Sequence, residues 1–155
     1  MPSKTTVRIA DQSDLNEILD MLWEMHLESG MGSLSVDRVQ EKVLSTFSKG
    51  LIIISENEQK ITGSIGLNKF QFWWSDDWAL ADQWSFVRKK HRKSKAFLSL
   101  VKKAKEIALE AKVPLLLANF GTVEEERKTK LFSRIGVKMG TTVITGDTSR
   151  FLWRK

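Results

Sequence analysis

Apolar residues recur at two spacings along the chain, and these spacings predict alternating strands and helices. The stretch TVRIA (6–10) predicts a first strand. Two segments with apolar residues every three or four positions then predict amphipathic helices, namely DLNEILDMLWEMHL (14–27) and SVDRVQEKVLSTF (35–47). Asp11 provides an N-cap for the first helix, and the glycines of ESGMGS (28–33) separate it from the second.

The rest of the chain predicts more strands than helices. Three strands joined by the polar turns ENEQ and SDD are expected at LIIISE (51–56), KITGSIGLNKFQFWW (60–74) and WALADQWSFV (78–87). A helix from near Lys95 to Ala111 follows, and the apolar run VPLLLANF (113–120) is typical of a strand buried on both faces. A capping box of Thr122 and Glu125 begins the last helix, Gly136 ends it, and KMGTTVI and RFLWR predict two final strands.

This order of elements predicts the fold class. It is a mixed α/β domain (an α+β mixed sheet) with a central, mostly antiparallel sheet and helices on both sides. A chain of 155 residues can bury one substantial core, so we expect a single domain over residues 1–155.

Aromatic residues cluster in KFQFWWSDDWALADQW (69–84). We expect Phe70, Phe72 and Trp84 to pack in the core. Adjacent residues of a strand point to opposite faces, so Trp73 and Trp74 cannot both be interior. One of them is therefore available for an acceptor groove or a homodimer contact, and the acidic turn beside them is expected to be solvated.

Composition narrows the chemistry. The chain has no cysteine, which excludes disulfides, thiolate metal sites and a cysteine nucleophile. Two distant histidines do not indicate a metal site, so no metal is expected. No apolar run is long enough to cross a bilayer, and we expect a cytoplasmic protein without a membrane partner. The net charge of +6 favours polyanionic partners.

Much of this charge lies in RKKHRKSKAF (88–97), between the strand that ends at Val87 and the helix that begins near Lys95. A turn from strand to helix directs backbone N–H groups at whatever lies above the helix N-terminus, and the helix dipole favours an anion there. Ser94 can cap this helix, while Arg92, Lys93 and Lys95 add charge. The arrangement suits a pyrophosphate better than a duplex groove.

The order of elements and this loop resemble the GNAT superfamily of acyl-CoA-dependent N-acyltransferases. In that family the loop has the pattern Arg/Gln-x-x-Gly-x-Gly/Ala, here RKSKAF: Arg92 matches, whereas Lys95 and Phe97 stand where the family has small residues. KLFSRIGVKMG is similar to another family stretch, with Gly136 in place. MHLESGMGSLSVDRVQEKV and HRKSKAFLSLVKKAKEIA are similar to small GNAT-like proteins of bacteriophages, which would place the chain in a host cytoplasm.

The resemblance implies an acetyl-CoA-dependent N-acetyltransferase that moves an acetyl group to an amine of a small molecule or protein by direct attack in a ternary complex. Acetyl-CoA would be the cosubstrate and an unidentified amine the acceptor. A backbone N–H on the strand from Trp84 to Val87 would stabilise the oxyanion. The residues expected to contact the coenzyme are Trp84, Phe86, Val87, Arg92, Lys93, Ser94, Lys95, Ala96, Phe97, Asn119 and Phe132.

The attacking amine must lose a proton, and three side chains are candidate bases: Asp82, Glu28 and His26. Family analogy favours Asp82, although strand parity leaves open whether it faces solvent. His26 and Glu28 have the alternative interpretation of ordinary helix-surface residues, and Asn119 that of a loop-forming residue. The chain has no Tyr, and Phe132 occupies the place where the family often has a Tyr that protonates the leaving thiolate.

Two other functions stay open. The missing Tyr and the missing loop glycines favour a GNAT-shaped protein that binds a partner without catalysis. The basic residues from Arg88 to Lys95 and from Lys102 to Lys105 would suit a nucleic-acid-binding protein, whose affinity falls steeply with salt.

Overall fold

A computed structural model of the chain describes residues 4–30, 32–118 and 125–136. In chain order the elements are β1 (Thr6–Ile9), the 3-10 turn η1 (Gln12–Asp14), α1 (Leu15–Ser29), α2 (Val36–Lys49), β2 (Gly50–Asn57), β3 (Lys60–Gln71), β4 (Trp78–Val87), the 3-10 turn η2 (Lys89–His91), α3 (Ala96–Glu110), β5 (Leu115–Leu116) and α4 (Glu125–Ile135).

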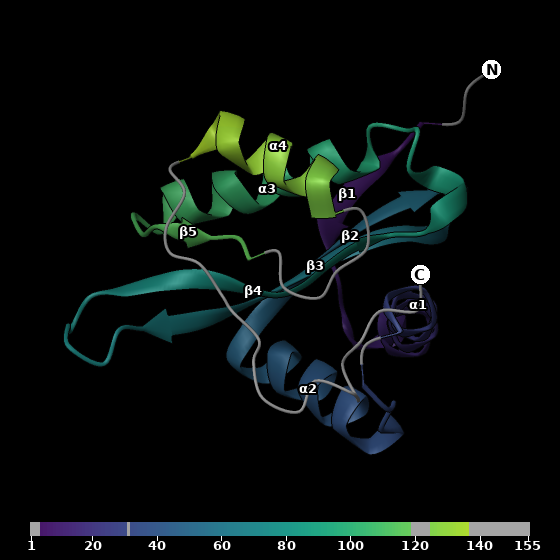
Figure 1. Cartoon of the computed structure of the whole chain (residues 1–155), viewed down its shortest axis with the longest axis horizontal. Coiled ribbons are helices and arrows are strands. Elements are labelled where there is room, and N and C mark those ends of the chain that lie inside the picture. The colour runs from purple at the N-terminus through teal and green to yellow at the C-terminus, as the bar shows by residue number, and fades with distance from the viewer. Residues whose placement is uncertain (1–3, 31, 119–124, 137–155) are drawn as a thin grey trace.

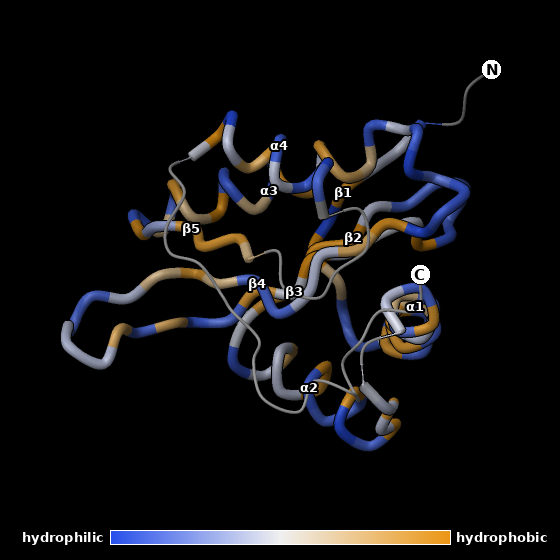
Figure 2. The backbone as a smooth tube through the Cα atoms, viewed as in Figure 1, coloured by the Kyte–Doolittle hydropathy of each residue, from blue (hydrophilic) through white to orange (hydrophobic). Residues whose placement is uncertain are grey.

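The sheet has the order β1-β2-β3-β4-β5, antiparallel from β1 to β4, with β5 parallel to β4. Helices α1 and α2 cover one face, and α3 and α4 lie over the other (Figure 1). The predicted mixed α/β class with a mostly antiparallel central sheet is confirmed. Figure 2 shows the apolar centre of the sheet between these two helical layers.

Each face of the sheet has its own core, because successive side chains of a strand point to opposite faces. Ile52 and Ile54 of β2 pack under α1 and α2, whereas Ile53 between them packs under α3. Burying each such side chain contributes about 1.5–3 kcal/mol. Strand β4 alternates in the same way, with Trp84 and Phe86 on the α1–α2 side.

Strand β4 contains a bulge that shapes the site. Its pairing with β3 passes from Trp84 opposite Gly66 to Asp82 opposite Leu67, so Gln83 is the extra residue. The Trp84 ring lies directly over Gly66, and a Cβ there would come within 2.5 Å of it. The indole N–H donates to Ser64 Oγ at 3.1 Å. Glycine at position 66 therefore allows Trp84 to enter the core beside the bulge.

The polar turn ENEQ is confirmed as the link between β2 and β3, where Glu58 and Gln59 have φ of 51° and 64°. The strand predicted over 60–74, however, ends at Gln71, because Ser75 N–H donates to the Phe72 carbonyl and turns the chain. Phe72 then stacks on Trp74, with the ring centroids 5.0 Å apart.

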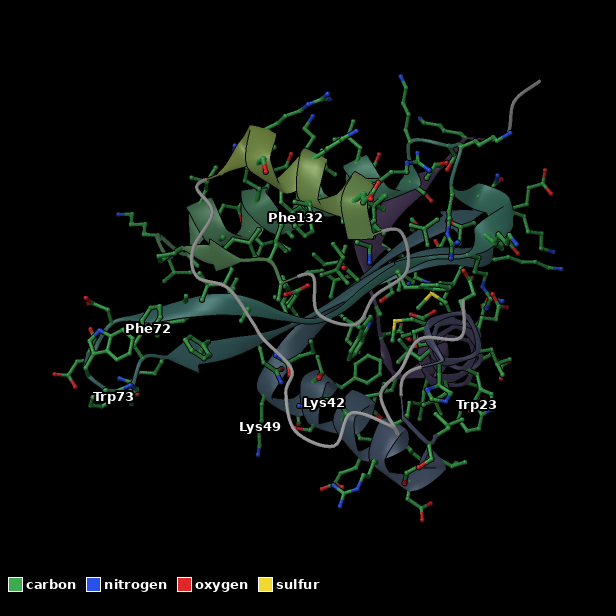
Figure 3. The ribbon with its side chains drawn as sticks, in the orientation of Figure 1. Trp23, Lys42, Lys49, Phe72, Trp73 and Phe132 are labelled. Carbon is green, nitrogen blue, oxygen red and sulfur yellow. The ribbon has the colours of Figure 1, made fainter. Side chains whose placement is uncertain are left out.

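The prediction that Phe70 is interior is wrong: it is 41% exposed, and Trp73 is 91% exposed. The β3–β4 hairpin extends past the described helices, so its tip has no helical layer to pack against (Figure 1). Figure 3 shows Phe72 and Trp73 at that tip, far from Phe132. Trp84, by contrast, is buried as predicted.

The strand predicted over 113–120 is also much shorter than expected. It pairs only at Leu115 and Leu116, with Leu80 and Ala81 of β4, and both of its residues are half-buried. Beyond this point Asp82 Oδ1 accepts the Ala118 N–H at 2.8 Å. A side-chain oxygen of β4 thus accepts a hydrogen bond that a backbone carbonyl would accept in a continuing strand pair.

Helix α4 ends at Ile135, and the Gly136 N–H donates to the Phe132 carbonyl at 3.0 Å, which confirms the predicted end. Thr122 of the capping box, Asn119, and the two strands predicted after Gly136 lie outside the described residues. Within the described ranges, no helix combines the length and apolar character needed to span a bilayer.

Candidate functional site at the outer edge of β4

The backbone of β4 after its bulge has one edge paired with β3 and one edge that faces away. Arg88 N–H donates to the Thr62 carbonyl, and the pairing continues through Phe86 with Ser64 and Trp84 with Gly66. Backbone polar groups of an antiparallel strand alternate in direction along the strand. Ser85 and Val87 therefore direct their N–H and C=O groups away from β3.

Lys128 of α4 reaches this edge from the α3–α4 side of the sheet. Its ammonium donates to the Ser85 carbonyl at 2.5 Å and to Ser85 Oγ at 3.3 Å. The same nitrogen lies 5.5 Å from the centroid of the Phe97 ring. Lys128 is only 6% exposed, which places a cation in a dry position against the strand.

Arg92 reaches the same edge from the other side of the sheet. Its Nε donates to the Val87 carbonyl at 3.0 Å, and a terminal nitrogen donates to Glu28 at 2.7 Å. The guanidinium lies over the Phe86 ring, 5.3 Å from its centroid. Both outward carbonyls of β4 thus accept from side-chain cations.

Asp82 lies at the point where β4 and β5 separate. Its side chain is half-buried, and burial raises its pKa to about 6. The Ala118 N–H and the positive charge of Lys128 act in the opposite direction and stabilise the carboxylate. A carboxyl group with this pKa is ionised at neutral pH yet close enough to accept a proton, as a general base must.

The basic stretch is less uniform than its composition suggests. Arg88 forms an ion pair with Glu24, and Arg92 with Glu28, so both arginines attach the loop to α1. The lysines of the stretch are instead exposed: they are Lys89, Lys90, Lys93 and Lys95. These lysines are the cations of the loop that a soluble anion can reach.

The N-terminus of α3 offers backbone donors beside those lysines. Ser94 Oγ accepts the Ala96 N–H at 3.1 Å, but the N-cap of α3 is Lys95 and no side chain caps the helix, so the predicted capping role of Ser94 is wrong. The N–H groups of Phe97 and Leu98 have no hydrogen-bond acceptor among the described residues. These amides and the helix dipole favour an anion at this end of the helix.

The structure places the other predicted site residues apart from this edge or within the core. The side chains of Trp84 and Phe86 are buried under α1 and α2. At the outer edge of β4, the outward groups are the backbone N–H and C=O of the neighbouring Ser85 and Val87. Glu28 is engaged by Arg92. His26, near the end of α1, is half-buried, and its carbonyl accepts the Gly30 N–H.

Phe97 and Phe132 form a small aromatic pair on the α3–α4 side of the sheet. Their ring centroids are 6.3 Å apart, and both pack against the core beneath α3. Ala96 is fully buried between Lys95 and Phe97. The large residue at position 97 is therefore accommodated by turning it into this core.

Sequence reasoning did not include Lys128 among the site residues, and it included Ser85 only as part of the strand from Trp84 to Val87. The alternation of side chains along β4 could have identified Ser85, because it lies between Trp84 and Phe86 and so faces the opposite side of the sheet. The spacing of Lys128 also indicated an inward position, since it lies three and four positions before Leu131 and Phe132, on the apolar side of its helix. Among the described residues no group of His, Asp and Glu side chains could hold a metal ion.

Known structures share the fold of this chain. A possible acetyltransferase of Clostridium difficile matches with a TM-score of 0.72 at 18% identity, covering 92% of this chain and 97% of that one. A GNAT family acetyltransferase of Staphylococcus aureus matches with a TM-score of 0.64 at 15% identity, covering 92% and 98%. A ribosomal-protein-alanine N-acetyltransferase of Brucella melitensis matches with a TM-score of 0.71 at 15% identity, covering 92% and 99%.

These likenesses establish that the chain has the fold of the GNAT acetyltransferases. No protein-family model matches the sequence, and no curated protein does. The predicted fold is thus confirmed at the level of architecture.

Proposed function

We propose that the chain is an acetyl-CoA-dependent N-acetyltransferase that transfers an acetyl group to an amine of a small molecule or a protein by direct attack in a ternary complex. One observation carries the proposal: within the GNAT fold, Asp82 lies beside the outward edge of β4, and its pKa is raised to about 6. A proton acceptor and a row of backbone donors are what amine acylation requires.

The residues at this edge fit a coenzyme A molecule. Coenzyme A has an extended arm with amide groups and a pyrophosphate, and when bound it supplies the acetyl group as a thioester. The N–H groups of Ser85 and Val87 would donate to the acyl oxygen and the arm. The amides of Phe97 and Leu98, with Lys95, would hold the pyrophosphate at the start of α3.

In this proposal Asp82 accepts a proton from the attacking amine. Its carboxylate is held by the Ala118 N–H, so it is oriented before any ligand arrives. Arg92 supports the site indirectly, because it ties the loop to Glu28 and holds the Val87 carbonyl. We propose this positioning role for it in place of a direct phosphate contact, since its guanidinium already has these partners.

The alternative is a GNAT-shaped protein that binds a ligand without catalysis. It is favoured by Phe132, which has no hydroxyl, and by Lys95, whose side chain stands where the family's loop has glycine. It is also favoured by the two cations that hold the outward carbonyls of β4.

Thiol release distinguishes the two functions. Native protein with saturating acetyl-CoA is offered a panel of amines that includes polyamines, aminoglycosides and peptides with free N-termini or lysines. The enzyme is expected to release coenzyme A thiol with at least one acceptor, and Asp82→Asn is expected to slow that release about 10²–10⁴-fold. Binding of coenzyme without release for any amine would favour the non-catalytic alternative.

A further inference from the structure

The buried Lys128 is the cation of this region that the proposed chemistry does not yet use. It comes from α4, one turn before Phe132, and reaches the Ser85 carbonyl on the outward edge of β4. Its surroundings are the Phe97 ring, the Ser85 hydroxyl and, by charge interaction, the Asp82 carboxylate. A buried ammonium needs compensating acceptors, and the Ser85 oxygens and the Asp82 carboxylate are among those that Lys128 has.

We infer that Lys128 is the cationic partner of the departing thiolate, placed at the β4 edge where the thioester would lie. The inference rests on the proposed function. When the acceptor nitrogen forms its bond to the acetyl carbon, the carbon–sulfur bond breaks and its electron pair goes to sulfur. The proton of the amine passes to Asp82, and the ammonium of Lys128 stabilises the negative sulfur without giving up its own proton.

The contacts of Lys128 suit this role. Its ammonium is already fixed by two acceptors on Ser85, so little reorganisation is needed when charge develops nearby. Lys128 is largely buried, and low exposure to water strengthens attraction between the ammonium and a thiolate. Phe132 offers no proton, and a cation one turn earlier on the same helix takes over the stabilisation of the leaving group.

Other charged groups lie around this position and enter the test. Asp82 of β4 opposes the effect of Lys128 on a thiol. Arg92 is paired with Glu28, and Lys95 at the start of α3 is exposed. The pKa of a bound thiol would reflect all four, and Lys128 already interacts with Asp82 at this edge.

The test measures the thiol pKa of bound coenzyme A from the ultraviolet absorbance of its thiolate, so it needs neither turnover nor a known acceptor. In native protein the bound thiol is expected to titrate about one pKa unit below free coenzyme A. Lys128→Met should remove that shift, and Lys128→Arg should keep most of it. Lys130→Met, an exposed lysine on the same helix, is the matched control and should behave as native.

The outcomes separate the two claims. A bound thiol pKa equal to or above that of free coenzyme A in native protein overturns the role of Lys128, whether or not any variant folds. An equal shift in native protein and Lys128→Met overturns it too. Failure of native protein to bind coenzyme A, measured by calorimetry with desulfo-coenzyme A in parallel, overturns the proposed function and this inference together.

Discussion

Two cations approach the same strand edge from opposite layers, and they differ in what holds them. Arg92, on the α1 side, is in an ion pair with Glu28 and donates to the Val87 carbonyl. Lys128, on the α4 side, donates to the carbonyl and hydroxyl of Ser85 and lies against Phe97. The first belongs to the framework that fixes the basic loop, whereas we propose that the second meets a ligand. A run of positive charge in a sequence does not by itself distinguish these roles.

The largest expected effect concerns the carboxylate beside Lys128. Asp82→Asn should lower turnover about 10²–10⁴-fold, the range for loss of a general base, while coenzyme binding changes little. In native protein kcat/KM should rise with pH through about 6, where Asp82 ionises. A variant that keeps turnover and the same pH profile would show that Asp82 only holds Ala118.

The same substitution has an opposite effect on stability. The folded-state pKa of Asp82 is raised above its unfolded value, so its ionisation costs folding free energy at pH 7. Asp82→Asn should therefore stabilise the fold at pH 7 by up to about 2 kcal/mol. That gain should disappear as pH falls through 6 toward 4, which thermal melting across this range would measure.

Matched substitutions of Arg92 and Lys128 test most directly whether the two cations have different roles. Arg92→Met should cost about 1.5–3 kcal/mol of folding free energy, because it leaves Glu28 and the Val87 carbonyl without their charged partner. Lys128→Met should stay within about 1 kcal/mol, because it removes the cost of burying a charge as well as the hydrogen bonds to Ser85. Urea denaturation would measure both, and equal losses would contradict the division of roles.

A smaller effect is expected from the exposed lysines. Lys95→Ala should weaken coenzyme binding about three- to fivefold, since a solvated phosphate contact contributes less than 1 kcal/mol. Lys102→Ala, on the exposed side of α3, is the control and should change nothing. Calorimetry at low and high salt should show the Lys95 effect shrinking with ionic strength. Equal effects of both substitutions would instead indicate a diffuse electrostatic surface.

The smallest effect is expected at position 132. A coenzyme thiol has a pKa near 8.5, similar to that of a free cysteine, and it can depart as the anion near neutral pH. Phe132→Tyr should therefore leave the fold intact and raise turnover by about threefold or less. Steady-state rates would check it. If turnover were lost while coenzyme binding was unchanged, the alignment of Phe132 with the family's Tyr would be wrong.

Periodicity sufficed for the architecture because both layers bury their apolar residues on regular faces. The helix spacing of α1, α2 and α3 and the length of β4 appear in the structure nearly as predicted. Phe70 was misplaced for a physical reason: alternation within a strand does not reveal whether a helix covers that part of the sheet. The short β5 has a similar cause, since Asp82 takes the Ala118 N–H where a continuing ladder would have paired.

The site was predicted less completely than the fold. Asp82 was chosen on analogy, and its role stays a prediction. The pairing of Arg92 with Glu28 joins residues far apart in sequence. Local patterns do not show which distant carboxylate will neutralise which cation. Lys128 was overlooked because a lysine in a polar helix is usually solvated; only its spacing from Leu131 and Phe132 marked it as inward-facing.

Direct binding of the coenzyme tests the central claim most simply. Isothermal calorimetry of the native chain with acetyl-CoA, coenzyme A and desulfo-coenzyme A should give one site for each ligand. At about a hundred times the dissociation constant, the ligand should add roughly 2.7 kcal/mol to folding stability. If millimolar coenzyme produces neither heat nor a thermal shift, the edge of β4 is not a coenzyme site and the proposed activity is wrong.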